Sequence, residues 1–259
     1  MSRPIVFVDL DDTLFQTQRK CPPDEPADRL TLAARATNGA HSLMTRRQKA
    51  FVDWLIATAE TIPVTARSRE AYGRVSIPFA SWAVVSNGAV ILDAAGTPDP
   101  AWAETRARGL GAHEGTRAAI RAHGRAAAET AGLDVRSWIV VEDALSAYAV
   151  FKQNDGDGER LAEIADAVAA GFDLGGWTVH RNGNNLGLLP PALSKRRAVE
   201  HLLARLREEA PTRPALGFGD SLTDLPFLEA CDFWGVPAGS QLARALSRDA
   251  GGAACGGAT

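Results

Sequence analysis

Apolar runs that end in polar or acidic residues place the strongest constraint on how this chain folds. Four such runs occur along its 259 residues: IVFVDLDDT at 5–13, TIPVTAR at 61–67, WAVVSNGA at 82–89 and ALGFGDSLTD at 215–224. Between the first two, QKAFVDWLIATAE has apolar residues at helical spacing. Strands that alternate with helices predict a parallel sheet, and ligands bind beyond the carboxyl ends of its strands. We therefore expect an α/β fold whose polar clusters converge at one sheet edge.

A second domain is indicated between residues 90 and 190. This span has a long helical pattern, two strand-like runs, a second helix and the segment WTVHRNGNNLGLLP, an order that predicts an inserted α+β unit. The segment SKRRAVEHLLARL then returns to a helix, with Ser194 as its expected N-cap. We expect a core domain at 1–89 and 191–250, a cap domain at 90–190, and a disordered Gly- and Ala-rich tail at 251–259.

The segment from Gln16 to Met44 has no clear period. A flap and a long ordered loop over the site are both open interpretations.

Three aspartates, Asp9, Asp11 and Asp12, crowd the end of the first apolar run. Like charges about 4 Å apart repel by about 4 kcal/mol at the effective dielectric near a protein surface, so a compensating cation is expected. For a single acidic cluster, solvated acids at a strand end are the simpler interpretation. Asp9 and Asp11, however, face the same side of a continuing strand, and a second cluster, GDSLTD, follows another apolar run. Two acidic strand ends in one sheet favour a divalent metal site, and Mg²⁺ prefers such oxygen ligands.

The ordered set of motifs resembles the haloacid dehalogenase (HAD) superfamily. DLDDT resembles its DxDxT motif and GDSLTD its GDxxxD motif, while Thr65, after TIPV, and Lys195 are similar to its Ser/Thr and lysine positions. An insertion between that threonine and that lysine resembles a C2 cap of type IIB, as in Cof-like and sucrose-phosphate phosphatases. One departure is Thr223, where many relatives carry Asn. The resemblance implies a Rossmann-like parallel-sheet core with an inserted α+β cap.

The resemblance also implies a role for each aspartate. Asp9 would be the nucleophile that forms an aspartyl-phosphate, and Asp11 the general acid for the leaving alcohol and later the base. Mg²⁺ would be bound by the side chains of Asp9 and Asp220 and by the main-chain carbonyl of Asp11, with Asp224 holding the metal shell.

Thr65 and Lys195 would steady the phosphoryl oxygens. Lys195 adjoins Arg196 and Arg197, and helix phase alone does not separate the three; the family position favours Lys195.

Arg67 has two open interpretations. Its guanidinium contacts a phosphate or a sugar hydroxyl of the substrate, or it is a surface arginine after a strand. Asn87 and Gly88 line the site or make a turn. In the cap, five polar residues near strand ends either contact a sugar or face solvent: Lys152, His180, Arg181, Asn184 and Asn185.

Composition favours a small-molecule enzyme. The chain is 46% apolar and 23% charged with a formal net charge of -3, which gives no basic excess for nucleic acid, and no apolar stretch is long enough to span a membrane. Its three cysteines form no CxxC pair, and the chain start is too quickly acidic for a signal peptide, so we expect a reducing cytoplasm.

We expect a Mg²⁺-dependent phosphatase acting on a small phosphorylated metabolite, with a sugar phosphate favoured. The alternatives are a phosphomutase or phosphotransferase that uses the same site, and a non-catalytic sugar-phosphate sensor. The sequence indicates no oligomeric state.

Overall fold

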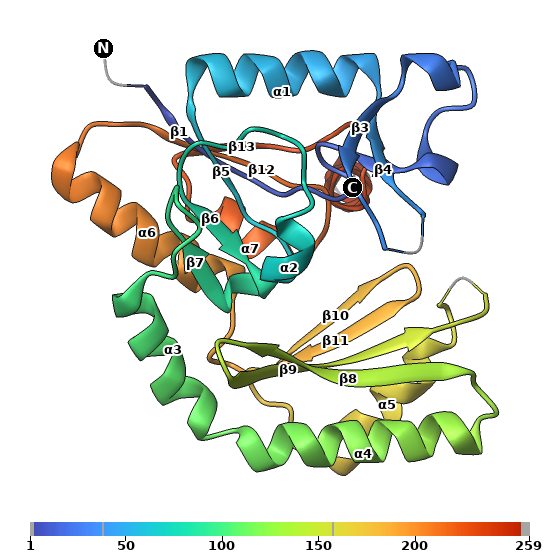
Figure 1. Ribbon diagram of the computed structural model, residues 1–259. Coiled ribbons are helices and arrows are strands. Elements are labelled where there is room, and N and C mark those ends of the chain that lie inside the picture. The colour runs from blue at the N-terminus through green and yellow to red at the C-terminus, as the bar shows by residue number, and fades with distance from the viewer. Residues whose placement is uncertain (1–2, 38, 157, 255–259) are drawn as a thin grey trace. The chain divides into compact units, whose positions relative to one another are not determined.

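The computed structural model describes residues 3–37, 39–156 and 158–254, and the chain divides into two compact units (Figure 1). The core unit comprises residues 1–99 and 195–259, and the cap unit comprises residues 100–194. Among the described residues, no helix is both long enough and apolar enough to cross a membrane.

The core unit is built on a parallel sheet. Its strand order is β13 (Phe233–Gly235), β12 (Ala215–Phe218), β1 (Ile5–Val8) and β5 (Glu60–Pro63), and every neighbouring pair is parallel. All four residues of β1 are buried, as expected for the middle of a parallel sheet that is covered on both faces. This burial is why the first apolar run is continuous rather than alternating.

The sheet extends past β5 into a hairpin. A parallel bridge joins Val64 to Val84, and β6 (Ala83–Val85) pairs antiparallel with β7 (Val90–Leu92). The units divide at 99/100 and 194/195, whereas the sequence predicted 89/90 and 190/191. The β6–β7 pairing ties 90–92 to the core.

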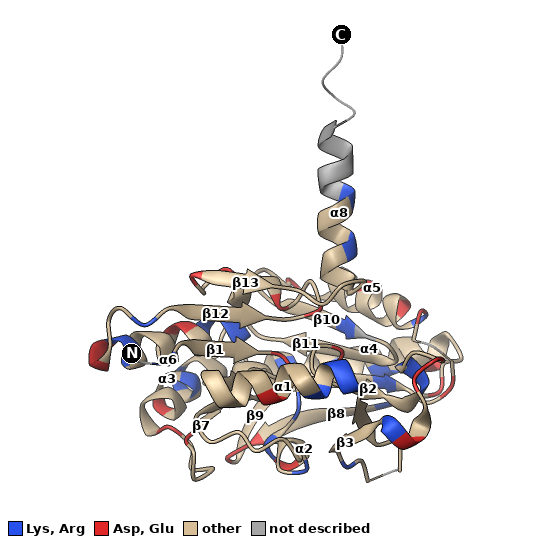
Figure 2. Cartoon of the chain, turned by 90° about the horizontal axis from the view of Figure 1, so that it is seen from above, with Lys and Arg blue, Asp and Glu red and all other residues tan. Residues whose placement is uncertain are grey.

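The core unit also contains α-helices. They are α1 (Arg46–Thr58), α2 (Arg69–Tyr72), α6 (Lys195–Glu209), α7 (Leu225–Leu228) and α8 (Gln241–Ala254). Helix α1 starts with a capping box, in which Gln48 N donates to Thr45 Oγ1 at 3.3 Å and Thr45 N donates to Gln48 Oε1 at 2.9 Å. Charges of both signs lie on α1 and α6 (Figure 2).

Residues 16–44 form an ordered β unit rather than a loop. Strands β2 (Gln16–Thr17), β4 (Ser42–Met44) and β3 (Thr31–Ala34) pair antiparallel in that order. Two short 3₁₀ turns, Gln18–Lys20 and Ala27–Arg29, connect β2 to β3. The buried face of this unit, which includes Ala33, Ala34 and Met44, packs into the same apolar cluster as β1.

The cap unit has the expected α+β architecture. Its elements follow in the order α3 (Pro100–Gly111), α4 (Glu114–Thr130), β8 (Val135–Glu142), β9 (Leu145–Gln153), α5 (Leu161–Gly171), β10 (Thr178–Asn182) and β11 (Asn185–Leu189). The four strands form an antiparallel sheet in the order β10-β11-β9-β8, and α4 and α5 cover one of its faces (Figure 1). Ile120, Phe151, Ile164 and Leu186 fill the space between helices and sheet.

A disordered tail is expected at 251–259. Helix α8 extends to Ala254, and 255–259 lie outside the described residues.

Candidate active site

Three buried aspartates meet at the carboxyl edge of the core sheet. Asp9 follows β1, and Asp220 and Asp224 follow β12. Since β1 and β12 are parallel neighbours, their carboxyl ends lie together, and Asp9 N donates to Phe218 O at 2.8 Å. Each aspartate offers a carboxylate oxygen within 4.8 Å of the others. Asp9 and Asp220 are 6% and 9% exposed and Asp224 is fully buried.

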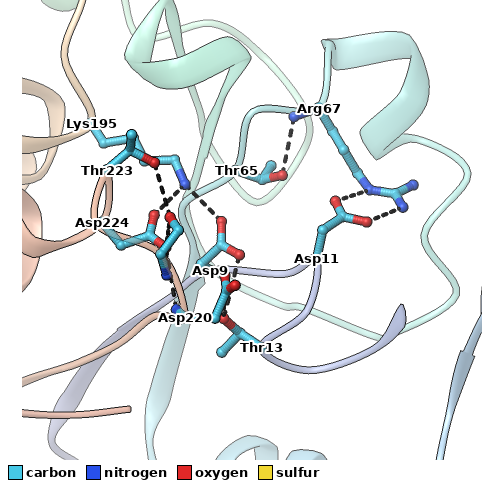
Figure 3. A network of polar contacts seen from close by, with 10 residues as sticks. Asp9, Asp11, Thr13, Thr65, Arg67, Lys195, Asp220, Thr223 and Asp224 are labelled. Atoms are coloured by element: carbon cyan, nitrogen blue, oxygen red, sulfur yellow. Dashed lines mark hydrogen bonds and ion pairs between the residues drawn. The ribbon is translucent and has the colours of Figure 1, made fainter. Parts of the chain in front are cut away.

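Lys195, the first residue of α6, bridges two of these carboxylates. Its Nζ lies 2.7 Å from Asp9 Oδ1 and 2.7 Å from Asp224 Oδ1 (Figure 3). Arg196 and Arg197 are exposed. The choice among the three cations, which helix phase left open, therefore falls on Lys195.

Burial and mutual repulsion disfavour the ionised forms of two of these aspartates. Burial raises the pKa of Asp9 well above its usual value, against the attraction of Lys195. Burial, together with the charge of Asp224, raises the pKa of Asp220 to about 7. Burial acts the same way on Asp224, but the Lys195 ion pair and the hydrogen bonds from Ser221 outweigh it and hold the pKa of Asp224 below its usual value.

The same balance acts on the lysine. Burial alone would lower the pKa of Lys195, but the charges of Asp224 and Asp9 outweigh it and raise that pKa. One buried ammonium thus faces three carboxylates. Hard oxygen donors in excess of the available positive charge are the ligand set that suits Mg²⁺, so these residues fit such an ion.

The GDSLTD loop is organised around Asp224. Its Oδ2 accepts hydrogen bonds from Ser221 Oγ at 2.7 Å, Ser221 N at 3.1 Å and Asp220 N at 3.3 Å. A Cβ at Gly219 would lie 2.7 Å from Asp224 Cβ, so the loop needs glycine there. Thr223, where the chain departs from the family pattern, has its Oγ1 2.9 Å from Ser221 Oγ and so supports the residue that orients Asp224.

Thr13 is a site residue to which the sequence reasoning assigned no role. Its Oγ1 lies 3.4 Å from both Asp9 Oδ2 and Asp220 Oδ1, and its single hydroxyl proton serves one of them at a time. The backbone turns sharply at Asp12, with φ 63°, and returns Thr13 to the aspartates. The sequence feature that could have indicated this role is the position of Thr13 at the end of the DLDDT motif.

Asp11 lies apart from the carboxylate cluster and pairs with Arg67. Arg67 Nε and Nη2 donate to Asp11 Oδ2 and Oδ1, both at 2.7 Å, and Nη2 also donates to Ser42 Oγ at 3.1 Å. The guanidinium stacks over the Phe15 ring at 5.0 Å. In Figure 3 the Asp11 side chain points toward Arg67 and away from Asp9. The guanidinium of Arg67, expected to contact a phosphate or a sugar hydroxyl or to lie on the surface, here pairs with Asp11.

Thr65 and the turn that follows β6 are joined by backbone hydrogen bonds. Thr65 is 1% exposed, its Oγ1 accepts from Arg67 N at 3.1 Å, and its carbonyl accepts from Asn87 N at 3.0 Å. Ser86, Asn87 and Gly88 have φ of 52°, 56° and 88°. This left-handed conformation is uncommon for residues other than glycine, and Asn tolerates it better than most. Asn87 and Gly88 therefore make the turn that was one of their two expected roles.

The polar cap residues expected to contact a sugar all lie on β9, β10, β11 and the β10–β11 turn of the cap unit. Asn184 Nδ2 donates to Gln153 O at 2.9 Å, so this residue is used within the cap sheet.

Solved structures with the same fold are known, although no protein-family model and no curated protein sequence matches this chain. The sucrose-phosphatase of Synechocystis sp. PCC6803, solved with sucrose and phosphate, is 15% identical with TM-score 0.56 and covers 97% of this chain and 98% of its own. The C-terminal domain of C. albicans trehalose-6-phosphate phosphatase is 14% identical with TM-score 0.51, covering 88% of this chain and 73% of its own.

A haloacid dehalogenase-like hydrolase from B. subtilis is 13% identical with TM-score 0.50, covering 90% of this chain and 94% of its own. The chain therefore has the HAD superfamily fold, with a Rossmann-like parallel-sheet core and an inserted α+β cap.

Proposed function

We propose that this protein is a Mg²⁺-dependent phosphatase that hydrolyses a small phosphorylated metabolite, with a sugar phosphate as the favoured substrate. The observation that carries the proposal is the buried cluster of Asp9, Asp220 and Asp224 bridged by Lys195 at the carboxyl edge of the sheet. The substrate class is taken from the names of two proteins that share the fold, a sucrose-phosphatase and a trehalose-6-phosphate phosphatase.

In the first half-reaction Asp9 attacks phosphorus. Lys195 binds Asp9 Oδ1 and so fixes the carboxylate, one oxygen of which attacks. The new bond joins this oxygen to phosphorus while the bond from phosphorus to the alcohol oxygen breaks, and Asp11 gives its proton to that oxygen. The products are the alcohol and an aspartyl-phosphate on Asp9.

In the second half-reaction Asp11 takes a proton from water. The water oxygen attacks phosphorus, the bond from phosphorus to Asp9 breaks, and inorganic phosphate leaves. Asp11 is then protonated and Asp9 is free, so the cycle closes without a further reactant.

Mg²⁺ would be held by the side chains of Asp9 and Asp220 and the carbonyl of Asp11, with Asp224 supporting this set, and when bound it offsets the negative charge of the phosphoryl group. Lys195 supplies a fixed positive charge beside the same oxygens. Thr65 Oγ1 accepts a hydrogen bond from Arg67 N, so its own proton remains to be donated to a phosphoryl oxygen.

Arg67 would hold Asp11 as the ionised carboxylate that takes a proton from water in the second half-reaction. Both carboxylate oxygens of Asp11 are held by the guanidinium, which Ser42 and Phe15 hold in turn. Two parallel N–H···O bonds fix the plane as well as the position of the carboxylate. We also propose a reducing, cytoplasmic location, which agrees with the free thiols of Cys21 and Cys231.

The test is phosphate release from a panel of monoesters: sucrose phosphate, trehalose 6-phosphate, glucose 6-phosphate and glycerol phosphate. Each is assayed with Mg²⁺ and after chelation, for the wild type, Asp9→Asn and the control Asp12→Asn. Asp12 lies in the same motif but pairs with exposed Lys20. We expect metal-dependent release that Asp9→Asn abolishes and Asp12→Asn retains.

Two results would redirect the proposal. An isomerised sugar phosphate without free phosphate would identify a phosphomutase. No turnover of any ester by folded, Mg²⁺-bound protein would favour the sensor.

A further inference from the structure

A cavity of about 420 Å³ lies in the core unit, lined by residues at the starts of three parallel strands. Arg3 precedes β1, Glu60 begins β5 and Arg213 precedes β12. The candidate catalytic aspartates follow the opposite, carboxyl ends of β1 and β12. Four residues of β1 separate the two edges by about 13 Å at roughly 3.3 Å per residue. The cavity is thus distinct from the candidate active site, and its volume suits a small ligand.

The charged groups of the cavity carry one net positive charge. Arg213 Nη2 donates to Glu60 Oε2 at 2.5 Å, and Ser81 Oγ donates to Glu60 Oε1 at 2.6 Å, so both oxygens of the only acid in the lining are occupied. Arg213 Nε donates to Arg3 O at 2.8 Å, and Arg3 Nη2 donates to Ile56 O. Each guanidinium has five N–H donors. Most of the donors on Arg3 and Arg213 therefore have no acceptor among the described residues.

A buried hydroxyl on the same lining also has no hydrogen-bond partner among the described residues. Thr61 is 4% exposed, and its Oγ1 makes no hydrogen bond there. That oxygen has almost no surface open to the cavity, so a ligand would not contact it, and the guanidinium groups are the polar partners that the lining offers. The rest of the lining is mainly apolar, with Ile56, Ala59 and Pro78 among its members. Cationic donors beside an apolar wall match a ligand that is anionic at one end and apolar at the other.

We propose that this cavity binds a small organic monocarboxylate. Its carboxylate would bind the guanidinium groups of Arg3 and Arg213, and its alkyl part would contact Ile56 and Ala59. A planar carboxylate fits the fork of a guanidinium. One negative charge neutralises the lining, whereas a phosphate dianion would leave a net negative charge beside Glu60. The site is independent of the proposed phosphatase reaction.

The probe is butyrate, added to ¹⁵N-labelled full-length protein freed of metal on a chelating resin, because dissolved chelators are themselves carboxylates. We expect saturable changes in the amide signals of Glu60, Thr61 and Ser81 with a Kd on the order of 1 mM, an affinity within reach of a six-atom ligand. Butanol is the uncharged match, and inorganic phosphate is the dianionic comparison.

Two variants and one control localise the binding. Arg3→Gln removes an exposed cation and should weaken butyrate binding about tenfold or more, while Ala80→Phe fills space at an exposed wall residue and should abolish it without changing any charge. Arg125→Gln, on exposed α4 surface of the cap, should have no effect.

The proposal is overturned if butanol shifts the same amides equally, or if butyrate binds both cavity variants like the wild type. It also fails if changes appear only around Asp9 and Lys195, if phosphate binds these amides more tightly than butyrate, or if no change occurs at about 50 mM butyrate, far above the expected Kd.

Discussion

Replacing Lys195 with methionine should destabilise the metal-free protein far more than the same change at Arg196. Lys195 Nζ lies 2.7 Å from Asp9 Oδ1 and 2.7 Å from Asp224 Oδ1, and its side chain is 8% exposed. Arg196 is 44% exposed and pairs with exposed Glu200. Methionine keeps an unbranched apolar stem of similar length. The difference between the two variants therefore measures the buried charge rather than the packing.

The magnitude follows from the carboxylate that loses its partner. A pair at 2.7 Å attracts by about 6 kcal/mol at an effective dielectric of about 20. Without it, buried Asp224 avoids an unpaired charge by binding a proton. From its ordinary pKa of 3.8, protonation at pH 7 costs about 4 kcal/mol, at roughly 1.4 kcal/mol per pH unit. This agrees with the roughly 3–5 kcal/mol typical of breaking a buried ion pair.

The loss should depend on pH with a definite sign. In the variant, the pKa of folded Asp224 rises above its unfolded value of 3.8, so the folded state binds one more proton than the unfolded state and its stability falls as pH rises. In the wild type the pKa of Asp224 is depressed, which removes this loss. The difference in unfolding free energy should therefore shrink from about 4 kcal/mol at pH 7 to about 2 kcal/mol at pH 5.

Urea unfolding followed by far-ultraviolet circular dichroism at pH 5, 6 and 7, on metal-free protein, measures this difference. Equal stability of Lys195→Met and Arg196→Met at pH 7 would refute the buried ion pairs. A large difference that does not change with pH would refute their electrostatic origin.

Three further outcomes are expected. Burial, with the neighbouring Asp224, raises the pKa of Asp220 to about 7, so Mg²⁺ binding should release protons and its affinity should fall about tenfold from pH 8 to pH 6. Calorimetry in buffers of different ionisation enthalpy tests this. Equal affinity at both pH values would contradict it. Arg67→Lys should lower kcat of the proposed hydrolysis about 10- to 100-fold with little change in KM, because lysine cannot hold the Asp11 carboxylate by two parallel bonds. A raised KM with unchanged kcat would instead make Arg67 a substrate ligand. Gly124→Ala should destabilise the cap by about 1–3 kcal/mol in thermal unfolding, since the new Cβ would meet the Phe151 ring at 2.5 Å. The control Gly115→Ala, in the same helix, adds its Cβ to open space and should leave the stability of the cap unchanged.

Local patterns predicted the elements that are long or buried on both faces. The continuous run at β1 and the helical spacing of α1, α4, α5 and α6 all correspond to elements of the structure. Strands β2 and β13, of two and three residues, were missed because they are too short to display alternation. The 16–44 segment forms its sheet through pairings between residues far apart in the chain, such as Gln16 with Leu43, and no local period encodes these.

The sequence by itself determined the chemistry available at the site. Aspartates directly after buried strands must reach the carboxyl edge of a parallel sheet, so the convergence of Asp9 with the GDSLTD loop followed from strand order and polarity. Lys195 was chosen there only by family position.

Tertiary structure decided the partners. Only the orientation of α6 buries Lys195 between Asp9 and Asp224 while Arg196 faces solvent. Asp11 and Arg67 are 56 residues apart, and Arg67 and Ser42 are 25 apart. Their contacts, like the raised pKa of Asp220, depend on burial and distance in three dimensions. Residue type and local period determine which chemical groups reach the site. Desolvation and the Coulomb energy between distant segments exist only once the chain has folded.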